Sequence, residues 1–325
     1  MDPPILLVDL DREAAPPVPA GPPERVVVGV SADLPEPGES CDVLLTARPG
    51  PPRPWVACPD PHATAARLAE AVTAHPAASI VLAQVLRMGV RLAPPERLVA
   101  ESLAYSALQA GDDFRAWLAA APVRTPRPAA APVRIARDGD RLAITLDRPG
   151  ARNAMDAGTR DALCEALHVA VADPSIGAID LRGEGPSFCA GGDLSEFGTS
   201  HDPAGTHLVR LHRSPAALLQ RCGPRVTAHL HGACVGAGIE LPAFAGRVAA
   251  APDTEIRLPE VGMGLIPGAG GTASLPVRIG RERTAYLALS GVALTAAEAL
   301  AWGLVDEVTA PAAAVSRTRA GAWPT

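Results

Sequence analysis

The stretch RLPEVGMGLIPGAGGT, residues 257–272, places one carboxylate, Glu260, in a run of apolar residues and glycines. Apolar side chains of this kind are normally buried, and burying an ionised carboxylate costs free energy unless the group is paired or hydrogen-bonded. Two structural explanations are open, because Glu260 could cap a turn or pair with an arginine such as Arg257 or Arg278. The third explanation is that the acid has a chemical role.

Two other glycine-bearing segments precede this one, PSFCAGGDLSEF at residues 186–197 and HGACVGAGIELPAF at residues 231–244. None of the three has both the spacing and the strand-to-helix context of a dinucleotide fingerprint or a Walker loop. In CAGGD we predict that a strand gives way to a helix that Asp193 caps. GAGIEL is predicted to open a helix, which leaves the amides near Ala237 unpaired at its positive end. Two such amide sources facing one cavity would form an oxyanion hole.

Composition narrows the class of protein. The 325 residues are 48% hydrophobic, which is enough for one large core or two modest ones. A net charge of -6 argues against nucleic acid as a partner, and no apolar run reaches the roughly 20 residues that cross a bilayer. The N-terminus lacks the basic start of a signal peptide and the six cysteines form no C-x-x-C pair, so we expect a cytoplasmic protein. The absence of lysine excludes Schiff-base chemistry.

Proline content divides the chain, since 22 of the 35 prolines lie in residues 1–132. The sequence predicts a short strand-rich segment at 1–60, a helical segment at 61–122, a Pro/Ala-rich linker at 123–133, a core at 134–310 and a short tail at 311–325. Helices are predicted at about 64–88, 96–109 and 156–171. Buried strands are predicted in RLAITLDRP and IGAIDLRGEG, so the fold class is α/β.

Five motifs in order resemble the crotonase, or enoyl-CoA hydratase/isomerase, superfamily: RPGARNAM (148–155), SFCAGGDL (187–194), HGACVGAGIEL (231–241), LPEVGMGLIPGAGGT (258–272) and ALAWGLVDEV (299–308). The resemblance implies a spiral of repeated ββα units and an acyl-CoA thioester as substrate, with no separate cofactor. It places the two oxyanion-hole amides at Gly192 and Ala237. It also places the two glutamates of the hydratases at Glu240 and Glu260.

The same motifs imply the thioester-binding residues, although coenzyme A recognition is less well marked. The turn RPGARNAM matches the family segment at the adenine end, but Gly150 stands where a basic residue is frequent. The substrate-binding positions implied are Arg152, Ala154, Ala190, Gly191, Gly236, Pro267 and Gly268. The histidines show no metal-ligand spacing, and we expect no metal site.

The largest departure from the superfamily lies at the ends, because only 17 residues follow Val308 where the relatives continue into trimerisation helices. Residues 62–122, ending in DDFRAWL, resemble those missing helices. We therefore expect this N-terminal extension to replace them and to pack on the 134–308 core of the same chain or of a neighbouring copy, through Leu68, Val72, Leu82, Leu103, Phe114 and Trp117. Residues 1–60 are either an abridged first copy of the core or an unrelated extension.

The function expected is that of an enoyl-CoA hydratase, a lyase in which two glutamates and an oxyanion hole add water to an acyl-CoA thioester or remove it. One alternative is double-bond isomerisation, for which one glutamate suffices. The other is a non-catalytic subunit that binds coenzyme A or scaffolds a partner. We expect a homotrimer or hexamer, possibly with another crotonase-fold protein, and neither nucleic acid nor membrane as a partner.

Overall fold

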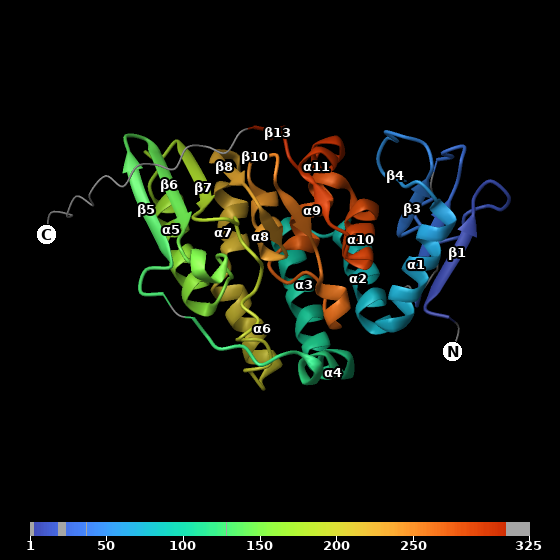
Figure 1. The fold of residues 1–325 in the computed structure, drawn as a ribbon, viewed down its shortest axis with the longest axis horizontal. Coiled ribbons are helices and arrows are strands. Elements are labelled where there is room, and N and C mark those ends of the chain that lie inside the picture. Colours follow the sequence, from blue (N-terminus) through green and yellow to red (C-terminus); the bar gives the residue numbers. More distant parts are fainter. Residues whose placement is uncertain (1–2, 19–23, 37, 128, 310–325) are drawn as a thin grey trace, which may run out of the picture.

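The chain forms three sheets in a computed structural model that describes residues 3–18, 24–36, 38–127 and 129–309. The first sheet is parallel, in the order β1 (Ile5–Asp9), β2 (Val26–Val30), β3 (Val43–Thr46) and β4 (Val56–Ala57). Valine dominates its strands, and every residue of β2 and β3 is buried, as expected of a parallel sheet covered on both faces. This sheet lies at the blue end of the molecule (Figure 1).

Four helices follow the first sheet: α1 (Pro61–Ala74), α2 (Pro76–Gly89), α3 (Pro94–Gln109) and α4 (Asp112–Ala120). The single helix expected at 64–88 is wrong, because the chain bends by 108° between α1 and α2. Pro76 has no N–H to continue α1, but its fixed φ suits the first turn of a new helix. Among the described residues no single helix is long and apolar enough to cross a membrane, and the α1–α2 pair meets that test only across the bend.

The main sheet has the order β13-β10-β8-β7-β6-β5, and its strands from β5 to β10 run from green to orange in Figure 1. Its strands are β5 (Val133–Asp138), β6 (Arg141–Leu146), β7 (Ala178–Gly183), β8 (Val226–Leu230), β10 (Arg247–Ala250) and β13 (Glu307–Val308). β5 and β6 form an antiparallel hairpin, and every other pair is parallel. The predicted strands at RLAITLDRP and IGAIDLRGEG are β6 and β7. α5 (Ala157–Ala172) connects them and covers β5 and β6.

A third, smaller sheet consists of β9 (Ala233–Val235), β11 (Glu255–Arg257) and β12 (Leu294–Thr295). β8 runs directly into β9, and β10 runs into β11, so consecutive strands alternate between the two sheets before each helix. This repeat is the expected spiral of ββα units. The remaining helices are α6 (Pro203–His212), α7 (Pro215–Cys222), α8 (Ala237–Glu240), α9 (Gly271–Ile279), α10 (Arg281–Ser290) and α11 (Ala296–Trp302).

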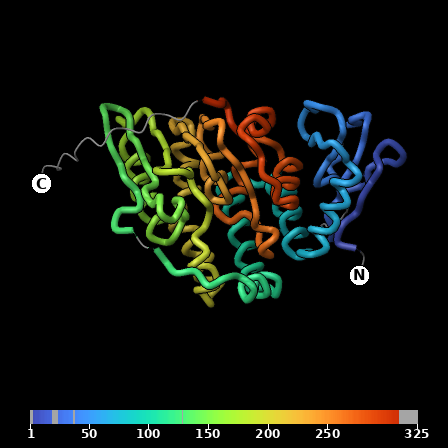
Figure 2. The backbone as a smooth tube through the Cα atoms, in the orientation of Figure 1, coloured from blue at the N-terminus to red at the C-terminus, as the bar shows by residue number. Residues whose placement is uncertain are grey.

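The N-terminal helices pack directly on this core. α2 and α3 contact α9, α1 and α2 contact α10, and α3 lies along α6. The backbone trace shows the teal segment passing across the orange and red one (Figure 2). Arg283 of α10, which is 3% exposed, joins the core to the N-terminal segment. It donates hydrogen bonds to the carbonyl oxygens of Trp55 at 3.0 Å and Pro51 at 2.9 Å.

Five of the six residues expected at this contact lie in the core: Leu68, Val72, Leu82 and Phe114 are at most 2% exposed, and Trp117 is partly buried against the same cluster. Leu103 does not pack on the core of its own chain, because that side chain is 54% exposed. Glu101 and Ser102 take the inward face of α3 instead, where groups of α9 and α6 satisfy their oxygens. Of the predicted segments, the tail at 311–325 lies outside the described residues.

We expect a shortened chain that begins at Ala131 to aggregate, because loss of α1–α4 uncovers the apolar faces of α9 and α10. Monomers rarely tolerate exposed apolar patches beyond a few hundred Å². Size-exclusion chromatography and binding of a hydrophobic dye measure this, with the full chain as control. A soluble, folded and monomeric 131–325 chain would show that residues 1–130 are a separable appendage.

Candidate active site

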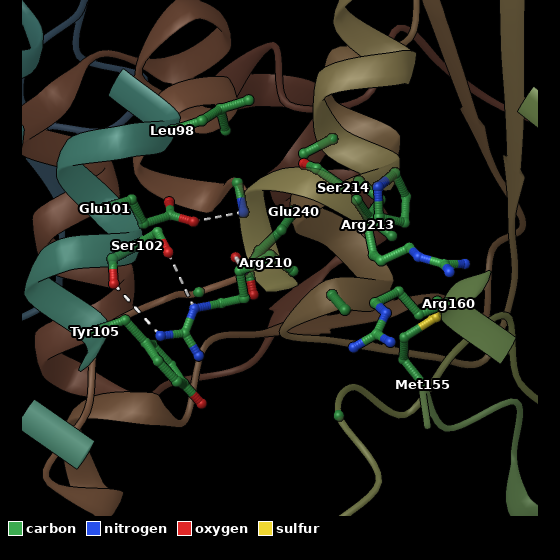
Figure 3. Close-up of a pocket in the computed structure, with 18 of the residues that line it drawn as sticks. Leu98, Glu101, Ser102, Tyr105, Met155, Arg160, Arg210, Arg213, Ser214 and Glu240 are labelled. Atoms are coloured by element: carbon green, nitrogen blue, oxygen red, sulfur yellow. Dashed lines mark hydrogen bonds between the residues drawn. The ribbon is translucent and has the colours of Figure 1, made fainter. Parts of the chain in front are cut away.

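A cavity of about 260 Å³ lies where α3 crosses the core, and it is lined by residues of both halves of the chain. α3 forms one wall with Leu98, Glu101, Ser102 and Tyr105, and Met155 and Arg160 lie on the opposite side (Figure 3). The expected catalytic residues Glu240 and Glu260 and the expected oxyanion-hole residues Gly192 and Ala237 all line this cavity. The structure therefore brings together four residues that span 69 positions in the sequence, from 192 to 260.

Glu240 is the last residue of α8 and is 2% exposed. Its Oε2 accepts hydrogen bonds from the backbone N–H of Ala269 at 2.7 Å and of Gly271 at 2.8 Å. Burial, followed by repulsion from the carboxyls of Glu260 and Glu101, raises the pKa of Glu240 well above its usual range. Within the described part of the chain, Glu240 is thus held by backbone amides and has no arginine as a partner.

Glu260 begins the short 3₁₀ turn Glu260–Met263. Its Oε2 is buried and has no hydrogen-bond partner among the described residues. The arginine pairing that the sequence left open does not occur, because Arg257 donates to the Gly291 carbonyl and Arg278 bonds the Ala243 and Ala245 carbonyls. Burial raises the pKa of Glu260 to about 8. An unpartnered buried carboxyl oxygen facing a cavity is available to a ligand.

The two carboxyls converge on Gly236. A Cβ at this position would lie 2.5 Å from Oε1 of Glu260 and 3.6 Å from Oε1 of Glu240. Gly236 also has a φ of 50°, in the left-handed region that side chains disfavour. Glycine is thus required at position 236 for two reasons: the backbone turn into α8 and the room that the two carboxyls need.

The expected oxyanion-hole amides flank the same space. Among the described residues, no hydrogen bond from the N–H of Gly192 or of Ala237 to another protein group is found. Ala237 is the first residue of α8, where N–H groups have no partner within the helix. A side chain at 192 would collide with the ring of Phe197, which lies 2.9 Å from a Cβ placed there. Both amides are therefore free to bind an oxygen of a ligand.

The prediction for Asp193 is wrong in one respect, because no helix begins after CAGGD. Asp193 instead accepts hydrogen bonds from the backbone N–H of Ser195 at 3.1 Å and from its hydroxyl at 2.7 Å. It also pairs with the buried Arg148 at 3.2 Å, which binds Asp156 at 2.9 Å as well. The glycines of CAGGD correctly indicated a sharp turn. Asp193, however, closes that turn rather than capping a helix, and its pair with Arg148 joins the turn to the segment RPGARNAM.

The substrate-binding positions implied by the family motifs lie in and around the cavity. Gly268 lines it directly. The N–H of Ala190 donates to the Arg152 carbonyl at 3.0 Å, and the N–H of Met155 donates to Gly191 at 2.7 Å, so the two motifs meet beside it. Pro267 adjoins Gly268 in the chain, and Gly236 separates the two acids. In the turn RPGARNAM, Arg152 is exposed and Ala154 is partly buried.

Among the cavity-wall residues that sequence reasoning missed are Glu101, Tyr105 and Arg210. Glu101 is 3% exposed, and burial raises its pKa to about 7. The Arg210 guanidinium lies 4.7 Å from the ring centre of Tyr105 and donates to Ser102 at 3.1 Å and to Gln109 at 3.1 Å. The available signal was the helical spacing Leu98, Glu101, Ser102, Tyr105, which puts polar groups on a buried face.

In the described part of the chain, no group of three or more His, Cys, Asp or Glu side chains has the arrangement of a metal site. His207 of α6 shares a hydrogen bond of 2.9 Å with Ser102. His229 pairs with Asp180 at 2.7 Å at the sheet. These histidines have structural partners.

The raised pKa of Glu260 predicts how stability depends on pH. A carboxyl with a pKa near 4.3 when unfolded and about 8 when folded binds more protons in the folded chain between those values. Unfolding free energy therefore falls as pH rises from about 5 to about 8. We expect Glu260→Gln to flatten this fall, measured as melting temperature against pH, while Glu165→Gln on the exposed face of α5 does not. Equal slopes in Glu260→Gln and the unaltered protein would contradict the assignment.

Comparison with known proteins identifies a family. A sequence model of the enoyl-CoA hydratase/isomerase family matches residues 140–322. The putative enoyl-CoA hydratase/isomerase YngF of Bacillus subtilis is 37% identical over 169 residues, 52% of this chain and 65% of that protein. The 2,3-dehydroadipyl-CoA hydratase of Escherichia coli is 36% identical over 167 residues, 51% and 65% respectively. The chain thus spans just under two thirds of the length of these relatives.

Solved structures lead to the same family. The enoyl-CoA hydratase of Thermoplasma volcanium GSS1 superposes with a TM-score of 0.51 at 37% identity, over 55% of this chain and 72% of that chain. A putative enoyl-CoA hydratase of Thermobifida fusca YX in complex with acetoacetyl-CoA gives 0.50 at 26% identity, over 56% and 74%. Because the family pattern covers more than half of the residues and the ββα spiral accompanies it, this chain belongs to the enoyl-CoA hydratase/isomerase family.

Proposed function

We propose that this protein is an enoyl-CoA hydratase, adding water to an α,β-unsaturated acyl-CoA thioester or removing it from the β-hydroxy product. The observation that carries the proposal is the convergence of the Glu240 and Glu260 carboxyls on Gly236, in a cavity that also exposes the amides of Gly192 and Ala237. The E. coli relative that acts on 2,3-dehydroadipyl-CoA and the structure with acetoacetyl-CoA support a thioester as the ligand.

The residues have distinct roles in this reaction. One carboxylate removes a proton from water as the water oxygen bonds Cβ, and the other, protonated, gives its proton to Cα. Between these steps the thioester oxygen carries negative charge, which the N–H groups of Gly192 and Ala237 stabilise. Two carboxyls in a low-dielectric site hold this mixed state near neutral pH, because each disfavours ionisation of the other.

Double-bond isomerisation is the second candidate, favoured by the unpartnered Oε2 of Glu260. A single carboxylate that is not held by other groups can take a proton from one carbon and return it to another. One relative, an enoyl-CoA isomerase/hydratase of Mycosarcoma maydis, carries both activities in its name. The product separates the two reactions, since hydration consumes the conjugated double bond and isomerisation moves it.

We expect Glu240→Gln and Glu260→Gln each to lower turnover of crotonyl-CoA by on the order of 10²–10⁴, because general acid–base catalysis contributes about that much. Thioester binding should persist in both variants, measured by calorimetry with a saturated acyl-CoA. Glu165→Gln, the same change at an exposed site, is the control and should retain the full rate. An unaltered rate in either active-site variant removes that residue from the mechanism, and loss in only one with a shifted alkene as product favours the isomerase.

The oxyanion hole is tested by a change of backbone, since its donors are amides. Ala237→Pro removes one N–H at the first position of α8, where proline is sterically compatible with a helix. We expect turnover to fall by at least about 10²–10³, the usual cost of one lost donor. Ala237→Gly, which keeps the N–H, is the matched control, and circular dichroism verifies folding of both. A folded and fully active Ala237→Pro variant would show that this amide does not bind the thioester oxygen.

We also propose that the protein works as a homotrimer or hexamer, in keeping with the superfamily resemblance, and that its substrate carries coenzyme A. The non-catalytic alternative is opposed by the retention of both glutamates within one cavity. Sedimentation equilibrium of the full chain measures the assembly.

A further inference from the structure

We propose that Glu101, which α3 contributes from the N-terminal segment, is a positioning residue that fixes the carboxyl of Glu240 and sets the protonation of the Glu240–Glu260 pair. The inference rests on the proposed function for its catalytic consequence. Its structural basis is independent of the reaction, because it lies in one shared stretch of backbone, residues 269–272.

Four consecutive backbone N–H groups at the start of α9 are divided between two carboxylates. Those of Ala269 and Gly271 donate to Glu240 at 2.7 and 2.8 Å. Those of Gly270 and Thr272 donate to Glu101 at 2.6 and 2.8 Å, and the Thr272 hydroxyl adds a third bond at 2.7 Å. Because alternate amides of one rigid turn hold the two acids, displacement of Glu101 releases half of the donors that orient this turn.

Because the two carboxyls are buried, their hydrogen bonds are strong and their charges repel each other. Glu101 is 3% exposed and Glu240 is 2% exposed, so water screens neither charge well. Both accept bonds at the N-terminus of a nine-residue helix, which favours the ionised forms. Mutual repulsion opposes that preference, and the carboxyl of Glu101 raises the pKa of both Glu240 and Glu260.

The other charged and titratable groups around Glu101 do not neutralise it by direct pairing. Arg210 of α6 lowers the pKa of Glu101 by its charge, but its hydrogen bonds go to α3 oxygens, of Ser102, Ser106 and Gln109. Tyr105, on the same helix, contacts Gly268. On the neighbouring helices Arg87 of α2 pairs with Asp42, Arg278 of α9 pairs with Asp306, and His207 of α6 bonds Ser102.

The sign of the effect follows from charge. Removing the carboxylate of Glu101 takes away a negative charge that disfavours ionisation of its neighbours, so the pKa values of Glu240 and Glu260 should fall. The bell-shaped pH dependence of kcat/KM should then move to lower pH on both limbs. A residue that only supported the fold would lower activity without moving this profile.

The test compares Glu101→Gln with Glu70→Gln, which removes the same charge from the exposed side of α1. The first readout is the pH profile of kcat/KM with crotonyl-CoA. We expect Glu101→Gln to lower kcat by about 10-fold or more, since misplaced catalytic groups lose that much, and to shift the profile to lower pH. Glu70→Gln should change neither quantity.

The second readout does not depend on activity. Carboxyl ¹³C resonances of glutamate, assigned with Glu240→Gln and Glu260→Gln, are followed against pH in the unliganded protein. Both titration midpoints should fall in Glu101→Gln and stay fixed in Glu70→Gln. Unmoved midpoints overturn the inference. If the full chain turns over no enoyl thioester while the midpoints shift as expected, the proposed function fails and the positioning role stands.

A second variant serves if Glu101→Gln does not fold. Thr272→Val keeps the shape of the side chain and the backbone N–H but removes the hydroxyl that donates to Glu101. Because that bond favours the ionised form, the titration midpoint of Glu101 should rise, and that of Glu260 should fall as Glu101 carries less charge. An unchanged Glu101 midpoint in Thr272→Val would overturn the proposed coupling between this turn and the acids.

Discussion

The turn formed by residues 269–272 is the constraint on which the rest of the site depends. Its N–H groups at the start of α9 hold the carboxyls of Glu240 and Glu101 with bonds of 2.6–2.8 Å. A helix N-terminus supplies unpaired donors and the positive end of a dipole, the two features that allow a carboxylate to be buried. The position of α9 thereby fixes Glu240, and Gly236 leaves the room in which Glu240 and Glu260 approach each other.

α9 is in turn held from both halves of the chain. The family pattern begins at residue 140, yet α2 and α3, which precede it, form one side of the packing around α9, and α3 supplies one wall of the cavity. Arg283 of α10 closes the same contact by binding carbonyls of Pro51 and Trp55. The site is therefore shared between a segment inside the family match and one outside it, and the second segment contributes an acid as well as apolar cover.

The sequence predicted the class of fold and the pair Glu240 and Glu260, because those residues lie in ordered local motifs whose glycines and acids have a specific chemical reason. It did not predict Glu101, whose donors are 169 and 171 positions away, since no local pattern reveals partners at that distance. The same gap explains why Leu103 does not pack within its own chain: on α3 a polar face is buried because its oxygens are satisfied by other elements. The helix predicted to follow Asp193 does not form, because a glycine-rich turn indicates a sharp reversal of the chain but not the element that comes after it.

Burial of three carboxyls around one cavity is unfavourable for stability whenever they ionise, and the proposed acid–base reaction gives a reason for this cost. Mutual repulsion and desolvation keep at least one proton among Glu101, Glu240 and Glu260 near neutral pH, which is the mixed state that acid–base catalysis needs. α3 contributes to that state in two ways, because it excludes water from the cavity and adds the third carboxyl. Because α3 precedes the family match in the chain, part of the desolvation and charge of this site comes from outside that match.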